Sequence, residues 1–130
     1  MVVASTYTKV GGVYDFGFRH DPDRPLESLA EYCLGCYTNL DLSSRVGKIA
    51  RYVEDYRADG FLINSVKSCN SFSAGQLMIL REVENRTGRP GGFIESDLVD
   101  PRYFSSSNIK NRLESYFQMI DQKRSARQES

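Results

Sequence analysis

The chain has 130 residues, of which 40% are hydrophobic and 26% are charged. This composition is that of an ordinary globular domain and excludes a largely disordered chain, while the length is too short for two separate cores. The 17 basic and 17 acidic residues cancel, so the net charge does not favour a surface that binds nucleic acid or an acidic membrane.

The apolar runs and the cysteines exclude two further classes of protein. No apolar run approaches the roughly twenty residues that span a bilayer, and no charged segment followed by a long hydrophobic one opens the chain. Three cysteines are too few for a disulfide framework. We therefore expect a cytoplasmic protein that does not enter the membrane. Because Val2 and Val3 begin at once as a core strand would, we also expect this chain to be cut from a longer one.

The first half of the chain predicts one strand and two helices. Residues 1–8 are apolar and β-branched and predict a buried strand, followed by a loop rich in glycine and proline over 11–25. Residues 25–38 predict a helix, and a second helix begins after the capping residue Asp41 and ends at Asp59-Gly60. The expected apolar faces are Leu26, Leu29, Ala30, Cys33 and Tyr37 on the first helix, and Val46, Ile49, Ala50, Val53 and Tyr56 on the second.

The second half predicts two strands, each followed by a helix. Residues 61–66 form a short apolar run typical of a strand in a parallel sheet, and Ser73 is the expected cap of the next helix, which ends at Gly88. Residues 92–98 predict the third strand, and a last helix follows Pro101. The expected apolar faces are Leu77, Leu80 and Val83, then Ile109, Leu113, Tyr116, Phe117 and Ile120.

Strands that alternate with helices predict an α/β domain. The expected architecture has three layers, with a small parallel sheet between helices, as in flavodoxin-like or Rossmann-like domains. In such sheets, ligands collect beyond the carboxyl ends of the strands. Reactive side chains are therefore most informative in the segments that follow the strands.

Cys69 lies in such a segment, and cysteine is the most reactive residue type found there. It follows the strand at 61–66, where a helix N-terminus and the nearby cation of Lys67 favour a thiolate, which can attack a substrate or bind a metal. A small buried hydrophobic residue is the alternative interpretation of a single cysteine. Polar side chains that could donate hydrogen bonds around it are Asn70, Ser71, Ser73 and Gln76.

Two other groups of residues have the composition of a site. Cys33 and Cys36 have the CxxC spacing, but they fall late in a predicted helix, so we expect them to be structural, with Cys33 facing the core. Glu95, Asp97 and Asp100 leave the third strand together and could form an acid/base or metal cluster. We expect them instead to accept hydrogen bonds from loop amides and to cap the next helix.

Three segments together resemble one known family. They are ADGFLINSVKSCNSFSAGQ (58–76), GFIESDLVDPRY (92–103) and NIKNRLE (108–114). All three resemble the C-terminal domain of the benzoyl-CoA reductase and 2-hydroxyacyl-CoA dehydratase family. The earlier segments RHDP (19–22) and RPLESLAEYC (24–33) look most like the B-subunit branch of the ATP-dependent benzoyl-CoA reductases.

The resemblance implies an incomplete iron–sulfur site. Residues 1–130 would be a single C-terminal α/β domain of a larger subunit whose upstream domains are absent. Cys69 matches one of three cysteines that bind a [4Fe–4S] cluster in this family, and the other two would lie upstream. Asn70, Ser71, Ser73 and Gln76 would surround the cluster. The resemblance assigns no catalytic residue, and we expect the isolated chain to be inactive.

The resemblance also implies a reaction and its partners. An ATP-dependent, ferredoxin-linked benzoyl-CoA reductase of anaerobic aromatic degradation reduces the ring of its CoA thioester to a cyclic dienoyl-CoA. ATP is hydrolysed by activator subunits, and this agrees with the absence of a phosphate-binding loop here, where Gly47-Lys48 lacks the required preceding glycine. The alternatives are a 2-hydroxyacyl-CoA dehydratase subunit and an interaction domain without metal.

Overall fold

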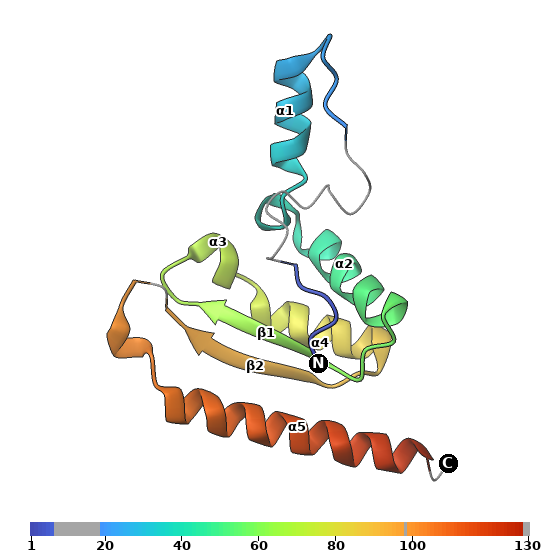
Figure 1. Ribbon diagram of the computed structural model, residues 1–130, viewed down its shortest axis with the longest axis vertical. Helices are drawn as coiled ribbons and strands as arrows, with labels where there is room; N and C mark the ends of the chain where they lie inside the picture. The colour runs from blue at the N-terminus through green and yellow to red at the C-terminus, as the bar shows by residue number, and fades with distance from the viewer. Residues whose placement is uncertain (7–18, 98, 129–130) are drawn as a thin grey trace.

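A computed structural model of the chain describes residues 1–6, 19–97 and 99–128 (Figure 1). Its helices are α1 (Pro25–Leu34), α2 (Leu42–Asp55), α3 (Asn70–Ser73), α4 (Gln76–Thr87) and α5 (Ser106–Gln128), with the 3₁₀ turns η2 (Tyr37–Asn39) and η3 (Pro101–Tyr103). Its strands are β1 (Phe61–Val66) and β2 (Gly91–Ser96). In these ranges no helix has both the length and the apolar composition to cross a membrane.

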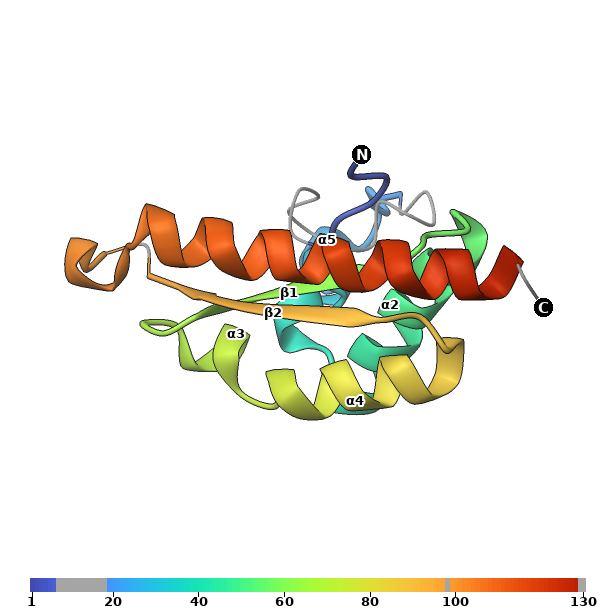
Figure 2. The same ribbon diagram turned by 90° about the horizontal axis from the view of Figure 1, so that it is seen from below.

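The two strands form a parallel sheet between two layers of helices. Phe61 pairs with Gly91 at one end of the sheet, and Val66 pairs with Ser96 at the other. Helices α2 and α4 cover one face, and α5 runs along the opposite face (Figure 2). The predicted three-layer α/β fold with a small parallel sheet is confirmed.

The core lies between α2, β1 and α4. Five buried apolar side chains form it: Val46, Val53, Ile63, Ile79 and Val83. Burying one such side chain stabilises the fold by about 1.5–3 kcal/mol. The apolar face predicted for α2 is confirmed at Val46, Ala50 and Val53, whereas Tyr56 beyond the helix is 53% exposed.

Asp41 begins α2 as predicted. Its carboxylate accepts hydrogen bonds from the Ser44 amide at 3.0 Å and from the Ser44 hydroxyl at 2.6 Å. These bonds hold the pKa of Asp41 below its ordinary value. A carboxylate at this position satisfies helix amides that have no carbonyl partner within the helix.

The predicted start and apolar face of α4 are wrong in part. Ser73 does not cap it, because the chain first makes the short helix α3 and then turns at Gly75, whose φ of +76° suits glycine. Leu77 is 56% exposed, and the side chains that α4 buries are Gln76, Ile79 and Val83. The end at Gly88 is confirmed.

The predicted first strand is not formed in the described residues. Residues 1–6 have no strand structure, and Met1 and Val2 are exposed. β-Branched composition favours a strand only where a neighbouring strand is available to pair with it. Residues 7–8 of this prediction lie outside the described residues, as does most of the loop predicted at 11–25.

Helix α1 is shorter than predicted and stands away from the sheet (Figure 1). It ends at Leu34, where the Asn39 side chain donates a 2.7 Å hydrogen bond to the Cys33 carbonyl. Ser28 is its buried residue, whereas Leu26 is 78% exposed and Cys33 is also exposed. The expected core position of Cys33 is therefore wrong, because no other layer in the described ranges covers this face of the helix.

Helix α5 packs against the sheet through Tyr116. This side chain is buried, and its ring lies against Gly92, where an added Cβ would be 2.8 Å from the ring. The glycine at this position therefore allows the helix to approach the strand closely. Phe117, which the sequence also placed on the apolar face, is exposed.

Candidate functional site

Cys69 lies beyond the carboxyl end of β1, as predicted. It is the residue that precedes α3, and its carbonyl accepts hydrogen bonds from the amides of Phe72 and Ser73. The thiol is exposed and is not part of a disulfide. The alternative interpretation of Cys69 as a small buried hydrophobic residue is therefore wrong.

The charges around Cys69 are smaller than the sequence suggested. Helix α3 has four residues, so few peptide dipoles add at its N-terminus. The ammonium Nζ of Lys67 lies 3.7 Å from Oε1 of Glu95 on β2, and both side chains are about 42% exposed. The Glu95 carboxylate therefore neutralises part of the positive charge of Lys67 that the sequence placed near the Cys69 thiol.

Asp97 connects the loop of Cys69 to the segment that follows β2. Its carboxylate accepts hydrogen bonds from the amides of Val99 at 2.8 Å and Asp100 at 3.0 Å. Hydrogen bonds from Ser68 also reach it, and together these donors lower the pKa of Asp97. The carboxyl ends of the two strands also lie side by side, since the Lys67 amide donates a 3.0 Å hydrogen bond to the Ser96 carbonyl.

The remaining carboxylates form caps and ion pairs. Asp100 caps η3 by accepting the Arg102 amide at 3.0 Å, and it pairs with the Arg102 guanidinium at 2.6 Å. These bonds lower the pKa of Asp100. The expected structural role of Asp97 and Asp100 is confirmed, and Glu95 pairs with Lys67.

Arg45 holds the other side of the Cys69 loop, and the sequence reasoning missed it. This α2 side chain is 9% exposed and donates to the carbonyls of Ser71 at 3.1 Å and Leu40 at 2.9 Å, and also to that of Thr38. Its guanidinium lies 5.5 Å from the centre of the Tyr37 ring. The available signal was an arginine one turn before Ile49, on the apolar face of the helix.

The predicted polar neighbours of Cys69 divide into two groups. Asn70 and Ser71 are exposed and Ser73 is half-buried, and all three belong to α3 directly after the cysteine. Gln76 is buried at the start of α4, where its amide Nε2 donates to the Phe72 carbonyl. Gln76 therefore supports the backbone between α3 and α4.

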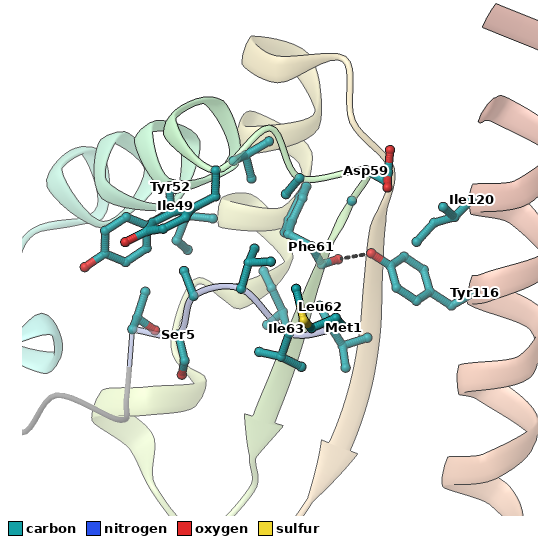
Figure 3. Close-up of a pocket in the computed structure, with 18 of the residues that line it drawn as sticks. Met1, Ser5, Ile49, Tyr52, Asp59, Phe61, Leu62, Ile63, Tyr116 and Ile120 are labelled. Atoms are coloured by element: carbon teal, nitrogen blue, oxygen red, sulfur yellow. Dashed lines mark hydrogen bonds between the residues drawn. The ribbon is translucent and has the colours of Figure 1, made fainter. Parts of the chain in front are cut away.

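A cavity of about 630 Å³ lies beside β1 and not at Cys69 (Figure 3). The N-terminal segment, α2, β1 and α5 surround it, and Ile49, Tyr52 and Phe61 contribute to its mainly apolar wall. Cys69 is not among the described residues that line it, although Gln76 is. The cavity runs along the edge of β1 that has no paired strand in the described part of the chain.

At position 69 the structure provides one candidate metal ligand, the thiol of Cys69. Among the described residues, which include all three cysteines, no three His, Cys, Asp or Glu side chains gather where they could hold a metal ion. Cys36 instead directs its thiol to the Tyr32 carbonyl at 3.9 Å. An exposed thiol is chemically suited to iron, but a four-iron cluster needs further thiolates than Cys69.

Comparisons with known proteins give one family and two relatives. The family model for 2-hydroxyglutaryl-CoA dehydratase, D-component, matches residues 1–120. The B subunit of the benzoyl-CoA reductase of Thauera aromatica is 70% identical over 125 residues, which cover 96% of this chain and 29% of that protein. The alpha subunit of the lactoyl-CoA dehydratase of Anaerotignum propionicum is 25% identical over 99 residues, 76% of this chain and 24% of that protein. The chain thus spans less than a third of either relative.

Proposed function

The chain belongs to the 2-hydroxyglutaryl-CoA dehydratase, D-component, family, and on that premise we propose that it is part of a benzoyl-CoA reductase subunit of the B type. The observation that carries this proposal is the 70% identity over 96% of the chain to such a subunit. The similarity to the lactoyl-CoA dehydratase subunit is much lower, at 25% over 76% of the chain. The reductase branch is therefore favoured over the dehydratase branch.

Residues 1–130 are, in this proposal, the C-terminal α/β domain of a longer subunit. The match to 29% of the length of the relative supports this assignment. The single core between α2, β1 and α4 supports it as well, since one core is typical of one domain. We infer that the isolated chain is inactive, since its described residues do not gather a complete cluster site around Cys69.

The proposed reaction is the ATP-dependent reduction of the aromatic ring of benzoyl-CoA to a cyclic dienoyl-CoA. The electrons come from ferredoxin through activator subunits that hydrolyse ATP. The lack of a phosphate-binding loop in this sequence agrees with ATP hydrolysis on a partner. The proposed location is the cytoplasm, in keeping with three cysteines that form no disulfide.

Cys69 is the proposed cluster ligand of this chain. When bound, a [4Fe–4S] cluster supplies one-electron transfer. The exposed thiol at the carboxyl end of β1 provides one thiolate, and Asn70, Ser71 and Ser73 provide hydrogen-bond donors beside it. Such donors tune the reduction potential of a cluster. Gln76 contributes through its hydrogen bond to the Phe72 carbonyl, which supports the backbone behind α3.

Reconstitution of the complete subunit with iron and sulfide tests the ligand assignment. Cys69→Ser should lose iron, visible absorbance and the EPR signal of the reduced cluster. Cys33→Ser and Cys36→Ser are matched controls that also remove one thiol, and they should keep the iron content of the wild type. A full cluster in Cys69→Ser would falsify the assignment.

Turnover by the complete complex tests the reaction. Under anaerobic conditions with ATP and reduced ferredoxin, benzoyl-CoA should be consumed and a dienoyl-CoA should form. Turnover of a 2-hydroxyacyl-CoA alone would instead assign the chain to a dehydratase. If the complete protein binds no iron, the remaining interpretation is that this chain is an interaction domain without metal.

A further inference from the structure

Two side chains from different layers hold the two ends of the Cys69 segment, defined as residues 68–71. Asp97 directly follows Ser96, whose carbonyl accepts a 3.0 Å hydrogen bond from the Lys67 amide, and hydrogen bonding with Ser68 contributes to the lowered pKa of Asp97. Arg45, on α2, donates to the carbonyl of Ser71 on the other side. The exposed thiol thus sits on a short segment whose ends are tied to separate parts of the fold.

The contacts of Arg45 leave its guanidinium little freedom. It donates to three backbone carbonyls, those of Thr38, Leu40 and Ser71, and lies over the Tyr37 ring. A planar guanidinium presents its donors in a rigid fork, so several acceptors fix its position. A buried charge also needs these partners, because losing them would leave it without solvent or acceptor. The Ser71 carbonyl is therefore held at a set distance from α2.

The contacts of Asp97 act on the opposite end of the segment. Its carboxylate receives the Val99 and Asp100 amides and the hydrogen bonds from Ser68. Both amides donate to Oδ1 of the carboxylate, and an amide in its place would keep one acceptor oxygen but lose the second oxygen and the negative charge. The loop after β1 is thereby joined to the loop after β2, since the two strands end side by side.

We propose that Arg45 and Asp97 are positioning residues that set the direction in which Cys69 presents its thiol. The consequence for a cluster rests on the proposed function, in which Cys69 is a cluster ligand. A ligand must hold its position to within a fraction of an ångström for the site to be preorganised. Neither side chain touches the cluster in this proposal, and both act through the backbone or hydroxyl groups next to Cys69.

Amide hydrogen exchange of the chain without iron measures this positioning. Arg45→Lys keeps the charge but loses the fork of donors, and Asp97→Asn keeps the shape but loses an acceptor. Each should speed exchange over residues 68–74 roughly tenfold, the effect of losing one hydrogen bond to a charged group. Arg51→Lys and Asp55→Asn are the matched controls, since both residues are exposed and lie further along α2. Unchanged exchange over 68–74 in both test variants would overturn the proposal.

A measurement on the complete subunit reaches the cluster. Asp97→Asn should keep the iron content and change the reduction potential or the EPR line shape, whereas a purely structural role would leave both as in wild type. Asp97 is not in the core, so this variant decides the question even if Arg45→Lys does not fold. Faster exchange together with a full cluster in Cys69→Ser would reject the ligand assignment and keep the positioning. Unchanged exchange in the test variants, together with loss of iron in Cys69→Ser, would reject the positioning and keep the ligand assignment.

Discussion

The hydroxyl of Tyr116 on α5 donates a 2.8 Å hydrogen bond to the carbonyl oxygen of Phe61, the first residue of β1 (Figure 3). These residues are 55 positions apart in the sequence. The same hydroxyl lies 3.4 Å from the carbonyl of Pro90, which precedes β2. One buried phenol thus connects the last helix to the beginning of both strands.

Removing this hydroxyl should destabilise the chain. Tyr116→Phe is expected to lower the free energy of unfolding by about 1 kcal/mol, because the part-buried carbonyl of Phe61 loses this donor. Urea denaturation followed by circular dichroism measures the change. Tyr56→Phe is the control, since Tyr56 is 53% exposed and should show no change beyond error. Equal stabilities of the two variants would contradict the role of the bond.

The same phenol predicts a loss of stability in alkali. Burial, with a smaller contribution from Glu84, raises the pKa of Tyr116 to about 12. The folded pKa exceeds the unfolded value of about 10, so the contribution of this group is complete below about pH 10 and is lost as the pH rises through 12. The stability advantage of wild type over Tyr116→Phe should therefore shrink between these values. Denaturant titrations across that range measure it, and a constant advantage would contradict the shift.

Gly92 and Gly47 should respond to alanine in opposite directions. A Cβ at Gly92 would lie 2.7 Å from Leu62 Cδ1 and 2.8 Å from Tyr116 Cδ2. Gly92→Ala should therefore destabilise the chain by about 1–3 kcal/mol through overpacking. Gly47, within α2, has no atom within 4 Å of the added Cβ, and Gly47→Ala should stabilise the chain by about 0.5–1 kcal/mol. Thermal melting of both variants measures this, and effects of the same sign would refute the predicted contrast.

Truncation on α4 distinguishes its buried face from its exposed one. Ile79 is 0% exposed, and Ile79→Ala should cost about 2–5 kcal/mol because it leaves a cavity in the core. Leu77→Ala removes an exposed side chain and should change stability by no more than about 0.5 kcal/mol. Urea denaturation of the pair measures both values. A larger loss of stability for Leu77→Ala than for Ile79→Ala would support the apolar face predicted from the sequence, which includes Leu77.

Removing the Asp41 side chain, which caps α2, should destabilise the chain, whereas removing the Ser73 side chain should not. Asp41→Ala should lower the melting temperature at neutral pH, because the amide and hydroxyl of Ser44 lose their acceptor. The folded pKa of Asp41 lies below its ordinary value, so its contribution is present above about pH 4 and is lost as the pH falls through the folded pKa. The difference from wild type should therefore vanish in acid. Ser73→Ala is the control with little expected change, and a loss equal to that of Asp41→Ala would argue against the assigned cap.

The local signals in the sequence predicted much of the fold. The bounds of β1, the cap at Asp41 and the end of α4 at Gly88 all agree with the structure. Each depends on residues a few positions apart, so the sequence contains the information directly. The position of Cys69 between β1 and a helix was predictable for the same reason. The short helix α3 was not, because the Arg45 guanidinium that binds its Ser71 carbonyl comes from a residue 26 positions away.

The sequence by itself determined the α/β class, the strand β1, and the family of the chain. Only the tertiary structure decided which side of α4 is buried, why α1 leaves Leu26 exposed, and which groups hold the Cys69 segment. The contact of Arg45 with Ser71 joins residues 26 positions apart, and that of Tyr116 with Phe61 joins residues 55 apart. Such contacts depend on how whole layers pack, and a periodic pattern within one helix does not contain that information.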